Sequence, residues 1–132
     1  MSVLCFMKVK AENLSSMERI AVMSMDEMSL EKAYSYDKAV DTMYKPHDKV
    51  QVVMVRGLIA NWRQPIYYAF DESNVQKILL NLIESVENAS YHVVALVHDL
   101  SSSNLRVWKN LEISAESQAN SFKNPCADRD VY

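Results

Sequence analysis

Two aspartates, Asp26 and Asp99, each close an apolar run that has the character of a β-strand. The first run covers residues 20–25 and the second covers residues 92–98. If the two strands are neighbours in one sheet, both carboxylates reach the same edge of that sheet. Two close carboxylates repel each other, and a divalent cation such as Mg²⁺, which takes oxygen ligands, relieves the repulsion. The pattern therefore predicts a metal-dependent phosphoryl-transfer site.

A simpler interpretation of the two aspartates stays open. Aspartate is common where strands give way to turns, so both could be turn residues of an unrelated α/β domain. Glu27 follows Asp26 directly, and alternation along a strand turns its side chain to the opposite face. We therefore regard Glu27 as a poorer ligand than Asp26.

The composition is that of an ordinary globular domain. The 132 residues are 49% apolar and 23% charged, which suffices for one domain with its own hydrophobic core. No apolar run approaches the roughly 20 residues that span a bilayer, so no membrane partner is expected. Residues 1–8 include a lysine and no small-residue cleavage site, unlike a signal peptide. The net charge of −3 lacks the electrostatic footprint of a free-standing DNA-binding domain.

The cysteines and histidines do not have the spacing of metal ligands. Cys5 and Cys126 lie near opposite ends without a CxxC motif, which favours a reduced thiol pair over a disulfide or a zinc site. His92 and His98 flank an apolar run and are interpreted as its exposed ends.

The first half of the chain predicts one helix and several strands. Residues 2–15 form a modest helix, and residues 20–26 form a strand that is apolar on both faces, as in a covered central strand. Two tyrosine-bearing runs, residues 33–36 and 41–44, predict a small hairpin. Residues 50–59 are rich in β-branched side chains and give the clearest strand.

The second half alternates strand and helix. Residues 65–70 form a strand with proline in its first position, where the missing N–H costs least. Residues 74–88 carry a one-sided apolar stripe after a Ser73/Gln76 capping box, which predicts a helix that packs on the core. This helix leads into a strand at residues 93–97, and strand, helix and strand in this order predict a right-handed crossover with parallel pairing.

The last third is more polar. Residues 101–104 are suited to cap a short helix that runs to about residue 111. Residues 116–129 are expected to be irregular, and residues 130–132 have the character of a strand that is beginning.

Short sequence words at several positions occur together and in order. They are Asp26-Glu27-Met28, Tyr36-Asp37, Gln51-Val52-Val53-Met54-Val55-Arg56-Gly57-Leu58, Trp62-Arg63-Gln64-Pro65, Ala69-Phe70-Asp71, Val93-Val94-Ala95-Leu96-Val97-His98-Asp99 and Asn124-Pro125-Cys126. As an ordered set they resemble the ribonuclease H-like catalytic core of P-element-type transposases, including the THAP-related members. The resemblance covers the chain from about residue 20 to residue 132.

This resemblance implies an α/β fold with a ribonuclease H-like mixed sheet, in which antiparallel strands and a parallel crossover strand are flanked by helices and the sheet is truncated at the fifth strand. Residues 1–132 would be a single partial domain, with residues 1–18 as an N-terminal helix or linker. Asp26 matches the family's first catalytic aspartate and Asp99 the second, so both are implied to be catalytic and to bind Mg²⁺. The implied activity is Mg²⁺-dependent cleavage of DNA at a transposon end followed by strand transfer. The implied compartment is the nucleus, although no targeting signal is seen.

The chain also departs from the family. The family's third carboxylate, a glutamate on a later helix, is expected beyond Tyr132. The family's zinc finger, dimerising coil and guanine-nucleotide-binding insertion are not recognised in these 132 residues. Residues 100–104 lack the glycine that the family usually carries after its second aspartate. With two of three ligands, we expect weak metal binding and no activity from this chain alone.

The alternative function is that of a non-enzymatic remnant, domesticated or truncated, which acts as an interaction or regulatory protein. The strand at residues 93–97 is apolar on both faces, and its expected neighbour begins only at residue 130. An open strand edge predicts self-association or pairing with a full-length transposase. Arg56 and Arg63 could contact DNA, and Trp62 could do so too, although a packing role at a strand turn fits Trp62 equally well.

Overall fold

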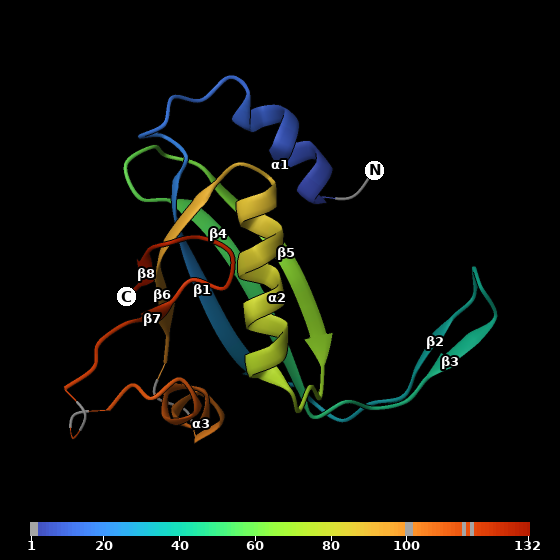
Figure 1. Cartoon of the computed structure of the whole chain (residues 1–132). Helices are drawn as coiled ribbons and strands as arrows, with labels where there is room; N and C mark the ends of the chain where they lie inside the picture. The colour runs from blue at the N-terminus through green and yellow to red at the C-terminus, as the bar shows by residue number, and fades with distance from the viewer. Residues whose placement is uncertain (1–2, 100–101, 115, 117) are drawn as a thin grey trace.

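The computed structural model describes residues 3–99, 102–114, 116 and 118–132 (Figure 1). Its elements follow the order expected of a mixed α/β domain. In chain order they are α1 (Val3–Ala11), β1 (Ile20–Ser29), β2 (Ser35–Asp37), β3 (Thr42–Tyr44), β4 (Lys49–Gly57), β5 (Arg63–Phe70), α2 (Val75–Asn88), β6 (His92–His98), α3 (Ser102–Asn110), β7 (Phe122–Lys123) and β8 (Asp130–Val131).

The central sheet has four strands in the order β5-β4-β1-β6. β4 pairs antiparallel with both β1 and β5, whereas β6 pairs parallel with β1. The parallel pair follows from α2, which carries the chain back between β5 and β6 so that β6 can run in the same direction as β1. The predicted mixed sheet with a parallel crossover strand is therefore confirmed.

Helix α2 packs across one face of this sheet (Figure 1), which we call the covered face. Its apolar stripe supplies five buried residues, and alternate residues of the strands meet them. The strand contribution comprises Ala21, Met23, Met25, Val53, Val55, Val93 and Leu96. The helix predicted at residues 74–88 is thus confirmed to within one residue.

The remaining alternate residues of the strands form the opposite, open face. By strand pairing and alternation they share one side of the sheet. Val22 and Val50 on this side are buried, whereas those named below are exposed or half-exposed. We define the open face by Ser24, Asp26, Val52, Met54, Arg56, Arg63, Tyr68 and Val97.

The capping box predicted at Ser73 and Gln76 is wrong. Asn74 is the N-cap of α2 and its side chain makes no capping hydrogen bond. The carboxylate of Glu72 accepts hydrogen bonds from the backbone N–H groups of Ser73 and Asn74, each at 2.9 Å. Gln76 is used elsewhere, because its Oε1 accepts a hydrogen bond from Asn110 of α3 at 3.0 Å. A tertiary contact has replaced the local one.

Two strand boundaries also differ from expectation. β1 continues three residues past Asp26, since Glu27, Met28 and Ser29 all pair with β4. β5 begins at Arg63, so Pro65 is its third residue and not its first. Proline is tolerated there because β5 is an edge strand and the β4–β5 register shifts at that point.

The predicted hairpin is confirmed as β2 and β3, which form a separate two-stranded ribbon that extends away from the sheet (Figure 1). At the foot of this arm Asp71 accepts hydrogen bonds from Nδ1 of His47 (2.8 Å) and from the N–H groups of Asp48 and Lys49 (3.0 Å each). These donors, His47 foremost, hold the pKa of Asp71 below its usual range. The arm is thereby fixed to the end of β5.

The two end regions complete the domain. The N-terminal helix is shorter than predicted, ending at Ala11. The short helix after Asp99 is confirmed as α3, while residue 101 of its expected cap (residues 101–104) lies outside the described residues. The region after residue 111 is largely irregular, with the short pair β7–β8. Tyr132 then bonds to β6 in a parallel pattern, through its N–H to Val94 O and its carbonyl to Leu96 N–H. None of the described helices has the length and apolar run that a bilayer crossing requires.

Candidate functional site

The β1–β6 register places the two predicted site residues at one edge of the sheet. Met25 of β1 is paired with His98 of β6, and Asp26 and Asp99 are the next residues of the two parallel chains. Both are exposed. The premise of the sequence argument, that these two remote positions lie on neighbouring parallel strands, therefore holds.

Asp26 lies on the open face, opposite Val52 of β4. Its Oδ1 accepts a hydrogen bond from the backbone N–H of Glu27 at 2.9 Å, which fixes the carboxylate close to the backbone. The other carboxylate oxygen takes part in no hydrogen bond within the described chain. A carboxylate in this setting retains the lone pairs that a hard cation needs.

Glu27 points to the covered face, as alternation predicted. Its carboxylate contacts Lys49 Nζ at 2.5 Å and Gln51 Nε2 at 3.2 Å, and its side chain is 15% exposed. The hydrogen bond from Lys49 holds the pKa of Glu27 below its usual range, while the charge of Asp99 acts in the opposite direction. The negative charge of Asp99 therefore acts on Glu27, whose two carboxylate oxygens already accept hydrogen bonds from Lys49 and Gln51.

His98 determines where the backbone goes after β6. Its Nδ1–H donates to the carbonyl oxygen of Asp99 at 2.7 Å, and its ring lies 4.7 Å from that of Trp108 on α3. The prediction that His98 marks an exposed strand end is wrong, because this packing leaves the residue only half exposed. The sequence signal that could have revealed the packing of His98 is Trp108, an aromatic residue in the helix that follows the strand.

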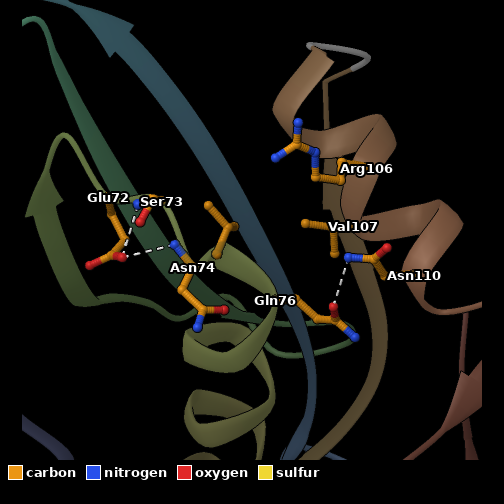
Figure 2. Close-up of a pocket in the computed structure, with 8 residues that line it drawn as sticks. Glu72, Ser73, Asn74, Gln76, Arg106, Val107 and Asn110 are labelled. Carbon is orange, nitrogen blue, oxygen red and sulfur yellow. Dashed lines mark hydrogen bonds between the residues drawn. The ribbon is translucent and has the colours of Figure 1, made fainter.

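α3 is in turn tied to α2 beside a hollow of about 350 Å³ at the N-terminus of α2 (Figure 2). Figure 2 shows Gln76 and Asn110 joined across this hollow and Arg106 on the α3 side. Glu72 accepts from the N–H groups of Ser73 and Asn74, just before the first residue of α2. The hydrogen bond between Gln76 and Asn110 therefore holds α3 against α2, and the contact between Trp108 and His98 holds α3 against the end of β6.

A second hollow, of about 490 Å³, lies on the open face near the turn that joins β4 to β5. Arg56 and Arg63 line it from directly opposite positions on the two strands. Trp62 in the same turn donates its Nε1–H to Glu18 O at 2.9 Å and packs 4.9 Å from the ring of Tyr91. Of the two interpretations of Trp62, these contacts support the packing role.

Sequence reasoning missed a buried carboxylate, Glu87, at the end of α2. Its side chain is 9% exposed; Oε1 accepts from the N–H of Val93 (2.8 Å) and from Nδ2 of Asn124 (2.9 Å), and Oε2 pairs with Arg129. These contacts join the loop before β8 to the α2–β6 connection. Glu87 directly follows the buried Val86, and nothing in its sequence neighbourhood marks it as a residue with a structural role. Its partners Asn124 and Arg129 are remote in sequence and meet it only in the folded chain.

Two further predictions concern metal and thiols. Within the described residues, no group of three or more His, Cys, Asp or Glu side chains is arranged to hold a metal ion. Cys5 and Cys126 form no disulfide with each other, in keeping with the expected thiol pair.

Comparison with known proteins agrees with this architecture. Residues 1–112 match the family model described as TNP-like, RNase H N-terminal domain. The chain is 34% identical over 118 residues to the transposable element P transposase of Drosophila melanogaster. The aligned region covers 89% of this chain and 15% of the relative. It superposes on a chain of the Drosophila P element transposase strand transfer complex with a TM-score of 0.87 and 29% identity, over 100% of this chain and 29% of the other.

The chain thus spans a minor part of each of these relatives. The family match, by contrast, covers most of its length and includes Asp26 and Asp99. The protein belongs to the TNP-like ribonuclease H N-terminal domain family, the fold of P element transposases.

Proposed function

We propose that this chain is the N-terminal part of a P-element-type transposase catalytic domain, in which Asp26 and Asp99 supply two of the ligands of a Mg²⁺ ion. The observation that carries the proposal is the parallel pairing of Met25 with His98, which brings the two aspartates to one edge. Family membership supports the same assignment. DNA is the proposed substrate, and the nucleus is the proposed compartment.

The donor set fits the proposed ion. Mg²⁺ takes oxygen ligands and is usually held by one or two carboxylates, with waters and substrate phosphates completing its shell. Two exposed aspartates at a sheet edge meet this requirement and leave room for a phosphodiester. When bound, the ion would polarise the phosphodiester and lower the pKa of a nucleophilic water.

The residues around the pair have separate roles in this proposal. Asp26 and Asp99 bind the ion and orient it against the open face. Glu27 takes no part, because Lys49 and Gln51 occupy its oxygens. His98 is a positioning residue, since its hydrogen bond to the Asp99 carbonyl sets the direction of the chain there. With only these two carboxylates, we expect weak binding and no turnover by the chain alone.

The proposal is tested by titrating the ¹⁵N-labelled protein with Mn²⁺, a paramagnetic substitute for Mg²⁺. We expect amide signals of residues 25–27 and 98–99 to broaden first, because they lie next to the proposed ion. Asp26→Asn or Asp99→Asn should abolish this selective broadening. Asp128→Asn, an equivalent change at an exposed aspartate of the loop before β8, should leave it intact. Broadening that persists in the Asp26→Asn and Asp99→Asn variants would contradict the proposal.

A nicking assay addresses the expectation of inactivity. With Mg²⁺ or Mn²⁺ and supercoiled DNA, we expect no cleavage by the isolated chain. Nicking that Asp26→Asn removes would show that this chain is catalytically complete. That result would overturn the inference that a further carboxylate is required.

A second candidate function is a non-enzymatic interaction or regulatory protein. It is favoured by β6, which is the outer strand of the four-stranded sheet and to which Tyr132 is hydrogen-bonded at Val94 and Leu96. Such an edge accepts an added strand from another chain. Co-purification with a full-length transposase that is unaffected by Asp26→Asn would support this role, and sedimentation as a monomer without any such partner would count against it.

A further inference from the structure

We propose that the open face carries a second ligand site, a pocket around Arg56 and Arg63 that binds a phosphate group of a DNA backbone. The proposal rests on the proposed function for the identity of the ligand as DNA. Its physical basis, however, is independent of the aspartates. It follows from how the two arginines are placed, what surrounds them and how the turn between them is built.

Arg56 and Arg63 lie directly opposite each other on β4 and β5. Side chains in such a pair start about 5 Å apart on the same face, and like charges in this arrangement repel. A protein gains nothing in stability from that placement. An anion between the two guanidinium groups would turn the repulsion into attraction, and guanidinium binds phosphate oxygens in bidentate fashion.

Both arginines are exposed, and neither forms an ion pair or side-chain hydrogen bond with any residue the structure describes. Arg129 shows the contrast, since its guanidinium is paired with the buried carboxylate of Glu87. The donors of Arg56 and Arg63 are therefore available to a ligand without first breaking an internal contact.

The two arginines project over a real hollow and not a flat surface. Its volume is about 490 Å³, and its lining includes Ser24, Met54, Asn61 and Val97 besides the arginines. The Asn61 amide supplies both donors and an acceptor, and Met54 and Val97 add apolar surface beside the arginines. Guanidinium and amide donors are the groups that bind phosphate oxygens.

The turn that holds the arginines in place is tightly built. The N–H of Gly57 donates to the carbonyl of Trp62 at 2.9 Å, and the Trp62 indole is anchored to Glu18. A Cβ at Gly57 would lie 2.3 Å from the Ala60 carbonyl oxygen and 2.7 Å from Trp62 Nε1. The close approach requires glycine, so the pocket is preorganised by its backbone.

The position of the pocket suits a DNA strand that also reaches the aspartates. Arg56 is opposite Val22 on β1, and Asp26 is four residues further along the same face. Four strand residues span roughly 13 Å at about 3.3 Å each. A DNA strand that crosses the open face could therefore contact the pocket and the proposed metal site with different phosphates of one backbone.

The test measures DNA binding without metal, so that it does not depend on catalysis. The full 132-residue chain is titrated with a short fluorescent DNA duplex in EDTA at several NaCl concentrations. Each phosphate contact adds about 0.9 to the salt dependence of log K. We expect Arg56→Gln and Arg63→Gln each to reduce the slope of log K against log salt by about 1, and the double variant by about 2. Circular dichroism confirms that the variants are folded.

Arg106→Gln is the matched control, because Arg106 is an exposed arginine on α3, beside the other hollow. It should leave the slope unchanged. An unchanged slope in the Arg56→Gln/Arg63→Gln double variant would overturn the proposal. An equal reduction by Arg106→Gln would also overturn it, since binding would then reflect overall charge and not this pocket.

Inorganic phosphate distinguishes the source of the ligand. If the side-chain Nε–H signals of Arg56 and Arg63 shift with phosphate while the DNA slope is unchanged in the double variant, the pocket binds free phosphate and the DNA assignment is wrong. If the double variant leaves the salt slope unchanged while Mn²⁺ still broadens the signals at Asp26 and Asp99, the proposed pocket for a DNA phosphate is wrong and the proposed metal site is supported. If the double variant lowers the salt slope but Mn²⁺ causes no selective broadening at Asp26 and Asp99, the metal site is wrong and the phosphate pocket is supported.

Discussion

The two faces of the central sheet differ in kind although the same strands build both. Along β1, Met23 and Met25 are buried against α2, whereas Ser24 and Asp26 lie on the open face. On the covered face the carboxylate of Glu27 is paired with Lys49 and Gln51. On the open face Asp26 is exposed, and Arg56 and Arg63 form no ion pair or side-chain hydrogen bond with another described residue. If the proposed ligand sites are correct, stability and ligand binding depend on alternate residues of the same strands, so mutations should separate the two.

The largest difference between the faces should come from the core. Ile83 of α2 is completely buried, and Ile83→Ala should lower the free energy of unfolding by about 2–5 kcal/mol, because it removes apolar contacts and leaves a cavity. Val97→Ala, a truncation on the open face at a residue that is 50% exposed, should cost less than about 0.5 kcal/mol. Urea denaturation measures both. Equal losses would show that the open face is a core surface too.

The next effect concerns buried polar contacts. Glu87→Gln should lower the free energy of unfolding by about 2–3 kcal/mol. The amide oxygen can still accept from Val93 and Asn124, but Arg129 loses its carboxylate and meets an amide N–H in place of Oε2. Asp26→Asn, the same kind of change on the open face, should leave stability nearly unaltered. Thermal unfolding of the two variants tests this; a larger loss for Asp26→Asn would mean that Asp26 is a structural residue.

Two tyrosines offer a matched pair with a smaller effect. Tyr91 is 1% exposed and its hydroxyl donates to the carbonyl of Met7 at 3.0 Å, so Tyr91→Phe should cost about 1 kcal/mol. Tyr68 is 70% exposed on the open face, and Tyr68→Phe should have no measurable effect on stability. Chemical denaturation distinguishes the two. If both substitutions were silent, α1 would not be held by the Tyr91 hydroxyl.

The smallest predicted effect is the pH dependence of the stability that Glu27 contributes on the covered face. The pKa of Glu27 is lowered in the folded state, mainly by Lys49, so its contribution is present above its unfolded pKa of about 4.3 and is lost as pH falls through the lower folded value. The difference in unfolding midpoint between wild type and Glu27→Gln should therefore shrink as pH falls from about 6 to about 3. A difference independent of pH would show that the Lys49 contact does not stabilise the fold.

Much of the architecture was predictable because local patterns and tertiary demands agree. The apolar stripe of α2 and the β-branched run of β4 fix their elements by periodicity alone. Asp26 and Asp99 were found because each follows an apolar run. The extension of β1 beyond Asp26 escaped prediction, since Glu27 and Ser29 are polar and are held in the strand only by pairing with β4. The Ser73/Gln76 cap failed because Asn110, remote in sequence, binds Gln76.

By itself the sequence determined which residues alternate between a buried and an exposed side, where the helix between β5 and β6 had to lie, and which acidic residues follow apolar strands. Only the tertiary structure decided that Met25 pairs with His98, that Arg56 faces Arg63 across two strands, and that Glu87 collects Arg129 and Asn124. The physical reason is that periodicity is a property of neighbours along the chain. Register and the satisfaction of buried charge depend instead on partners that are remote in sequence and meet only in the folded state.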